Sequence, residues 1–210
     1  MKTTRRIFTL VLALMMVLSL SVTAFADGIT SAPTGTVTVM FTSGLSKNTD
    51  AGNVWNDLDP SEHVLYAGGT VNLTALVGRT KTYIPSGTTD PMGGKASVMD
   101  AIMAANSSNV FVTGWDANPW VGDPGAYISN VNNTTLASNY EETPDAEDSS
   151  IIHCHSWGTG FVVILEDADG NISFPSVYVS NIEPTNSMTI YVDLAEYNYT
   201  WTKPASTSTN

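Results

Sequence analysis

The residues best suited to chemistry lie in one short segment, IIHCHSWGTG, at positions 151–160. His153 and His155 stand on either side of Cys154, which is the only cysteine of the sequence. Successive side chains of a β-strand point to opposite faces, so the two histidines would share one face and the cysteine would lie on the other. We therefore do not expect the three residues to form one reactive centre.

The two histidines remain a candidate metal pair. Imidazole nitrogens at positions i and i+2 of a strand suit zinc or another transition metal. A third ligand would have to come from His63 or from an aspartate. The alternative is two solvated or hydrogen-bonded histidines on a half-buried strand, and we assign no cofactor.

Cys154 has no base directed toward it, because strand alternation turns both neighbouring histidines away. The pattern favours a small buried thiol over a nucleophile. The sequence contains no other nucleophile–base pair and no complete set of metal ligands. We therefore expect a protein that is not an enzyme.

Asp167 and Asp169 begin a segment, DADGN at 167–171, that matches part of a calcium-binding loop. The later acidic ligands of such a loop are missing, because Ser173, Phe174 and Pro175 follow. Asp-Gly between two apolar runs is also a common hairpin turn. We favour the turn.

The most attractive binding candidate is the segment WDANPW, which contains Trp115, Asp116 and Trp120. Tryptophans beside a carboxylate offer flat apolar faces with polar edges, which suit a sugar or a peptide. The alternative is that both rings hold a long loop against a sheet, as large aromatic side chains are usually well buried.

Residues 1–26 have the pattern of a secretory signal peptide: a basic start, an apolar run and the small-residue motif Ala24-Phe25-Ala26. Removing them takes away three cations and no acidic residue, so the formal net charge falls from −12 to −15. This charge excludes nucleic acid as a partner. No second apolar run follows, so we expect no transmembrane segment after cleavage. The AFAD junction at 24–27 is typical of a bacterial export signal. We therefore expect a bacterial protein that is secreted or loosely held at the cell surface.

The mature chain is expected to form one domain at 36–201, after a lead at 27–35 and before a polar tail at 202–210. One helix is predicted at about 97–106, where Ser97 and Asp100 form a capping box. Gly68-Gly69 is interpreted as a hairpin turn, and long loops are expected at 43–62 and 132–150. Strands are predicted at 36–41, 63–67, 70–77, 110–113, 151–156, 161–166, 172–180, 188–194 and 197–201. The predicted fold class is α+β, dominated by strands.

Four segments in order resemble the transcobalamin C-terminal-like domain family: SVMDAI at 97–102, GAYISNV at 125–131, SWGTGFVV at 156–163 and MTIYV at 188–192. The resemblance implies a β-grasp-like mixed sheet crossed by one helix. It also places Trp157 at a position that faces ligand in that family. The large helical domain that completes a corrinoid site in transcobalamins has no counterpart in this sequence, so the resemblance does not by itself imply corrinoid binding.

The preferred functional hypothesis is a secreted, non-catalytic binding or cell-surface interaction module. Its ligand would be an extracellular glycan, peptide or small molecule, bound by Trp115, Asp116, Trp120 or Trp157. Two alternatives stay open: a metal-binding secreted protein that uses His153 and His155, and a corrinoid-like small-molecule binder. The sequence leaves the oligomeric state undetermined.

Overall fold

The computed structural model describes residues 33–106, 111–118 and 123–204. The predicted signal peptide, most of the predicted lead and Trp120 lie outside these residues. Within them the fold is α+β and dominated by strands, with one α-helix and a mixed sheet, so the predicted fold class is confirmed. None of the described helices is long and apolar enough to cross a membrane.

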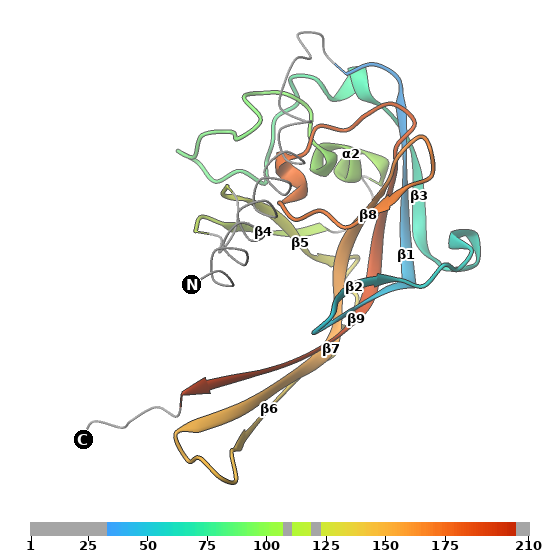
Figure 1. Ribbon diagram of the computed structural model, residues 1–210. Helices are drawn as coiled ribbons and strands as arrows, with labels where there is room; N and C mark the ends of the chain where they lie inside the picture. The colour runs from blue at the N-terminus through green and yellow to red at the C-terminus, as the bar shows by residue number, and fades with distance from the viewer. Residues whose placement is uncertain (1–32, 107–110, 119–122, 205–210) are drawn as a thin grey trace, which may run out of the picture. The chain divides into compact units, whose positions relative to one another are not determined.

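The main sheet has seven strands, in the order β2-β1-β9-β7-β6, with β3 added to β1 and β8 added to β7 (Figure 1). β1 and β9 run parallel, and the other described pairs of this sheet are antiparallel. The strands are β1 (Thr36–Thr49), β2 (Gly52–Trp55), β3 (Val64–Asn72), β6 (Ser138–Pro144), β7 (Ile151–Glu166), β8 (Ile172–Ser173) and β9 (Thr189–Pro204).

A second, two-stranded sheet follows the helix in sequence. It pairs β4 (Phe111–Asp116) with β5 (Gly125–Val131) in antiparallel register. Three short 3-10 helices complete the described structure: η1 (Pro60–Glu62), η2 (Leu73–Leu76) and η3 (Val179–Asn181).

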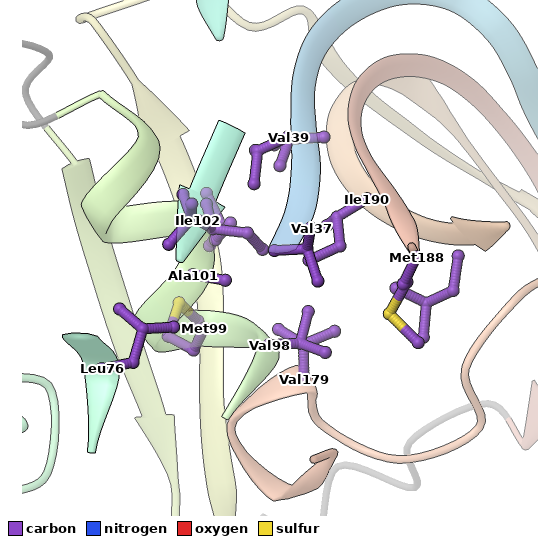
Figure 2. Packing of buried hydrophobic residues seen from close by; sticks show 14 of the residues in the cluster. Val37, Val39, Leu76, Val98, Met99, Ala101, Ile102, Val179, Met188 and Ile190 are labelled. Atoms are coloured by element: carbon purple, nitrogen blue, oxygen red, sulfur yellow. The ribbon is translucent and has the colours of Figure 1, made fainter. Parts of the chain in front are cut away.

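The predicted helix is confirmed as α2, Val98–Ala105. Ser97 accepts a hydrogen bond from the backbone N–H of Asp100, and the Asp100 carboxylate accepts one from the backbone N–H of Ser97, which completes the predicted capping box. The helix packs against β1, β3, β9 and η3. In Figure 2, Val98 and Ile102 of the helix lie with Val37 of β1 and Val179 of η3 among the buried side chains of the main core.

Two strands are much longer than predicted. β7 runs unbroken from Ile151 to Glu166, where two strands were expected, and β9 continues through the expected break into the predicted tail. The reason is mutual pairing, because every residue of β7 has a partner in β9. Gly158 does not interrupt the ladder: a Cβ there would lie 2.1 Å from the carbonyl oxygen of Ala137, so glycine permits this close approach.

The expected hairpin at Gly68-Gly69 is wrong, because both glycines lie inside β3. A Cβ on Gly68 would lie 2.0 Å from the carbonyl oxygen of Val39 on β1, close to a register shift between these strands. The glycine therefore serves a close backbone approach rather than a turn. The long loop expected at 43–62 is also corrected: it contains the end of β1, the whole of β2 and η1.

The acidic segment at 132–150 was expected to be a loop, and part of it is a strand instead. β6 pairs with β7 along its full length, from Ser138 opposite Gly158 to Pro144 opposite Ile152. All seven residues of β6 are exposed, so the strand lacks the apolar alternation that would have identified it.

A buried carboxylate joins β1 to β9 where their pairing is irregular, between Ser43 and Lys47. Asp193 is fully buried and accepts four hydrogen bonds: from the Thr42 hydroxyl, the Leu45 N–H, the Ser46 N–H and the Ser46 hydroxyl. Leu45 and Ser46 lie within this irregular stretch of β1 and Thr42 lies just before it, so the carboxylate holds the bulge in place.

Candidate functional site

An open cleft of about 470 Å³ lies beside the small sheet. Four side chains line it: Trp115 and Asp116 from the end of β4, Tyr127 from β5, and Tyr178 from the segment before η3. Two of these, Trp115 and Asp116, are residues that the sequence predicted for a binding site. We call this set of four residues the aromatic cleft.

Glycine allows the first ring of the cleft to lie across the sheet. Gly114 and Tyr127 are directly opposed in the β4–β5 pair. A Cβ on Gly114 would lie 2.2 Å from the Cζ atom of Tyr127, so the tyrosine ring occupies the space above the glycine. Tyr127 is 44% exposed, and its hydroxyl forms no hydrogen bond with another described residue.

A second glycine, Gly125, leaves room for Tyr178 to pack on the small sheet. A Cβ on Gly125 would lie 2.5 Å from the Cβ atom of Tyr178, so this tyrosine packs directly on the start of β5. The segment after it is fixed to the same strand, because the Ser180 hydroxyl accepts a 2.8 Å hydrogen bond from the Ala126 N–H. The Asn181 side chain donates to the Pro124 carbonyl oxygen at 3.0 Å. The position of Tyr178 is therefore set by its packing on Gly125 and by the hydrogen bonds of Ser180 and Asn181, which follow it in the chain.

Asp116 is the acidic group of the aromatic cleft. Its Oδ2 accepts a 2.7 Å hydrogen bond from the Tyr178 hydroxyl, and its Oδ1 accepts one of 2.9 Å from the Asn118 N–H. Both bonds, that from Tyr178 first, lower the pKa of Asp116 below its usual value. The same carboxylate raises the pKa of Tyr178 to about 12. At neutral pH the cleft therefore holds the charged Asp116 carboxylate beside the neutral Tyr178 phenol.

No lysine, arginine or histidine within 33–106, 111–118 and 123–204 forms an ion pair with Asp116. Trp115 has two roles, since it lines the cleft and also packs against the main core. This position of Trp115 is compatible with both interpretations of the segment, and its role in binding stays a prediction. Trp120 lies outside the described residues.

The histidine pair has the predicted strand geometry. His153 is exposed and Cys154 is buried, as alternation requires. The two imidazoles are engaged separately: His153 Nε2 lies 2.7 Å from Asp145 Oδ2, and His155 Nε2 lies 3.0 Å from Asn198 Oδ1. This contact with His153 is the main reason that the pKa of Asp145 is lowered to about 2.

A third metal ligand is not assembled around these histidines in the described part of the chain, where no group of three or more His, Cys, Asp or Glu residues suits a metal ion. His63, the suggested third ligand, instead has its Nδ1 atom 3.0 Å from the carbonyl oxygen of Ser43. Cys154 has the Tyr140 hydroxyl 3.4 Å from its Sγ atom and neither imidazole on its own face.

Trp157, the position suggested by the family resemblance, lies on β7 and lines neither of the two cavities described. Its ring stacks on His155 with centroids 4.3 Å apart. The second cavity, of about 230 Å³, lies over β7 and β9, where Tyr197 and Tyr199 stack with centroids 5.9 Å apart beside Gly160.

The segment at 167–171 forms the turn favoured from sequence, between β7 and β8. Asp167 Oδ1 accepts hydrogen bonds from the N–H groups of Asp169 and Asn171, each at 2.9 Å, and Oδ2 accepts one from the Asn171 side chain. The carboxylate is thus used by the turn itself.

Sequence reasoning missed two of the four cleft residues, Tyr127 and Tyr178. Tyr127 lies in the segment GAYISNV, to which no binding role was assigned. The signal that could have found it is a glycine in each of two neighbouring strands, since a glycine inside a strand indicates that another group approaches closely. Tyr178 has no such local signal.

Comparison of the chain with protein-family models, with curated proteins and with solved structures finds no match. The resemblance to the transcobalamin C-terminal-like family therefore stays a prediction.

Proposed function

We propose that the protein is a secreted, non-catalytic binding module, and that the aromatic cleft is its ligand-binding site. The observation that carries this proposal is the packing of two tyrosine rings, Tyr127 over Gly114 and Tyr178 over Gly125. With the Asp116 carboxylate, these rings line an open cleft of about 470 Å³. Ligand sites are commonly concave, mostly apolar and equipped with a few placed polar groups.

The ring geometry favours a small ligand unit with a flat or rounded apolar surface. The Tyr127 and Tyr178 centroids are 6.2 Å apart and their planes are inclined by 33°, so the rings do not close on each other face to face. The faces stay available to a sugar ring, a side chain of a peptide or a small molecule, and Asp116 supplies a hydrogen-bond acceptor beside them. Export, which the sequence predicts, would place such a site outside the cell.

The test is a panel of immobilised glycans, peptides and small molecules, probed with the labelled mature chain. Three proteins are compared: the wild type, Tyr127→Leu and Trp201→Leu. Trp201 is a matched control, because it is another large aromatic residue, 43% exposed, that lies on β9 and does not line the cleft.

We expect the wild type and Trp201→Leu to retain the same panel members, and Tyr127→Leu to lose them. The proposal fails if the wild type retains no member of the panel, or if Tyr127→Leu binds as the wild type does. Thermal unfolding of each variant shows whether a loss of binding reflects a loss of fold.

A further inference from the structure

We infer that the aromatic cleft takes a ligand with an alkylated ammonium group, such as the trimethylammonium of choline. This inference rests on the proposed function, since it names the chemical class of the ligand for the same site. It is carried by the combination of aromatic faces with a carboxylate that lacks a cationic partner among the described residues.

The aromatic part of the cleft suits a cation. The face of an aromatic ring carries partial negative charge, and a quaternary ammonium bound by several rings is a recurrent use of this attraction. Tyr127 and Tyr178 offer such faces 6.2 Å apart, with Trp115 at the border of the cleft.

The Asp116 carboxylate makes the cleft negatively charged. Asp116 is held in place by the Tyr178 hydroxyl at 2.7 Å and by the Asn118 N–H at 2.9 Å. Asp90 and Glu183 have lysine partners, each at 3.1 Å, whereas Asp116, like most of the described carboxylates, forms no ion pair with a described residue. At Asp116 the negative charge is fixed and is not neutralised by a described side chain, so a cationic ligand can supply the missing charge.

A trimethylammonium group fits this arrangement better than a primary amine does. Its methyl groups bury apolar surface against the rings and its charge is spread over them, whereas an ammonium ion with three N–H donors is strongly hydrated and needs acceptors that the cleft offers at few points. The acidic net charge, −12 for the whole sequence and −15 without residues 1–26, adds a long-range attraction for cations and a repulsion for anions. A phosphate next to the ammonium group should therefore weaken binding, so we assign a cation without an adjacent phosphate rather than a lipid headgroup.

The experiment is a titration of the ¹⁵N- and ¹³C-labelled mature chain, followed through the Trp115 indole and the ring signals of Tyr127 and Tyr178. Four probes are used: choline, its neutral isostere 3,3-dimethylbutan-1-ol, phosphocholine and a neutral methyl glycoside. The proteins are the wild type, Asp116→Asn, which retains an acceptor for Tyr178, and Trp201→Leu as the control outside the cleft.

We expect choline to shift the cleft signals with an affinity about tenfold above that of 3,3-dimethylbutan-1-ol, as a cation–π and carboxylate contribution of this kind predicts. Asp116→Asn should reduce this preference to less than about threefold, and 0.5 M salt should weaken choline binding. Phosphocholine should bind more weakly than choline, and Trp201→Leu should behave as the wild type.

The inference is overturned if 3,3-dimethylbutan-1-ol binds as tightly as choline, or if choline shifts signals elsewhere and leaves the cleft unchanged. If the glycoside shifts the cleft signals and choline does not, the binding site stands and its cationic ligand class is wrong. If no probe and no member of the panel shifts the cleft signals, the proposed function fails as well.

Discussion

The Tyr178 hydroxyl donates a hydrogen bond of 2.7 Å to Asp116, a residue 62 positions earlier in the chain. This bond joins the segment before η3 to the end of β4, and it combines a phenol ring with a fixed negative charge at one place. The candidate site depends on this hydrogen bond, because it brings two of the four residues that line the cleft together from distant parts of the chain.

The first prediction concerns the ionisation of Tyr178. Its pKa is raised to about 12, chiefly because its hydroxyl donates to the Asp116 carboxylate, so Asp116→Asn should move this pKa back toward the ordinary value of 10.0. Between pH 10 and about pH 12, the Tyr178 hydroxyl keeps its proton in the folded state and has lost it in the unfolded state. The stability from this bond is therefore present below pH 10 and is lost as the pH rises toward about 12.

The measurement is an alkaline titration of the assigned Tyr178 ring signal. Asp123→Asn is the control, because the Asp123 side chain forms no bond with Tyr178. An unchanged midpoint in Asp116→Asn would show that the bond does not control the ionisation of this tyrosine.

The second prediction concerns the glycine under Tyr127. Gly114→Ala places a methyl group where the Tyr127 ring lies, so the ring must move away from β4. Because Tyr127 is 44% exposed, we expect its ring to move toward solvent with a stability loss of only about 1 kcal/mol. Affinity for any ligand of the cleft should fall at least about fivefold, as pre-positioned contacts are lost.

Gly160→Ala is the matched control, because the atom nearest to its new Cβ lies 4.0 Å away, on Tyr197. It should change the free energy of unfolding by less than about 0.5 kcal/mol. Ring contacts between Tyr127 and residue 114, measured as nuclear Overhauser effects, report the displacement directly. Ligand affinity that is unaffected by Gly114→Ala would contradict this account of the cleft.

The third prediction concerns the buried Asp193. Asp193→Asn replaces one acceptor oxygen with an NH₂ group that faces donors on the β1 bulge, so at least one buried donor loses its partner. We expect a loss of about 1–3 kcal/mol in the free energy of unfolding, measured by urea denaturation. Asp169→Asn, at an exposed turn position, should have little effect. Equal stability of the two variants would mean that the bulge does not depend on the carboxylate.

The fourth prediction concerns Asp145 and His153. Asp145 should titrate at about 2 in the folded protein, and His153→Ala should return its pKa toward 3.8. A carboxyl whose folded pKa is lowered contributes stability above its unfolded pKa and loses it as the pH falls through the folded value. The window for this pair is thus about pH 4 down to about 2. A carbonyl-carbon NMR titration checks it, and an Asp145 midpoint that stays the same in His153→Ala would refute the contact.

The parts of the fold that depend on local chemistry could be predicted from the sequence. The capping box of Ser97 and Asp100 defines the start of α2, and alternation places His153 and Cys154 on opposite faces. The length of β7 and β9 could not be predicted, because their continuity comes from pairing with each other over distant positions. β6 was missed because an exposed, acidic strand that pairs with β7 lacks an apolar pattern.

The candidate site divides in the same way. Trp115 and Asp116 were found because aromatic and acidic residues are adjacent in the sequence. Tyr127 and Tyr178 were not assigned, because their roles follow from the cross-strand partner Gly114 and from the anchoring of η3 on Gly125 and Ala126. Such contacts are set by the tertiary fold and not by local spacing.

The most direct test of the binding site is a map of intermolecular nuclear Overhauser effects between labelled protein of residues 27–210 and the best ligand from the panel. The account predicts contacts from the ligand to the rings of Tyr127 and Tyr178, which line the cleft of about 470 Å³. Ligand contacts to Tyr197, Tyr199 and Trp201 on β9, with none to Tyr127 and Tyr178, would contradict it.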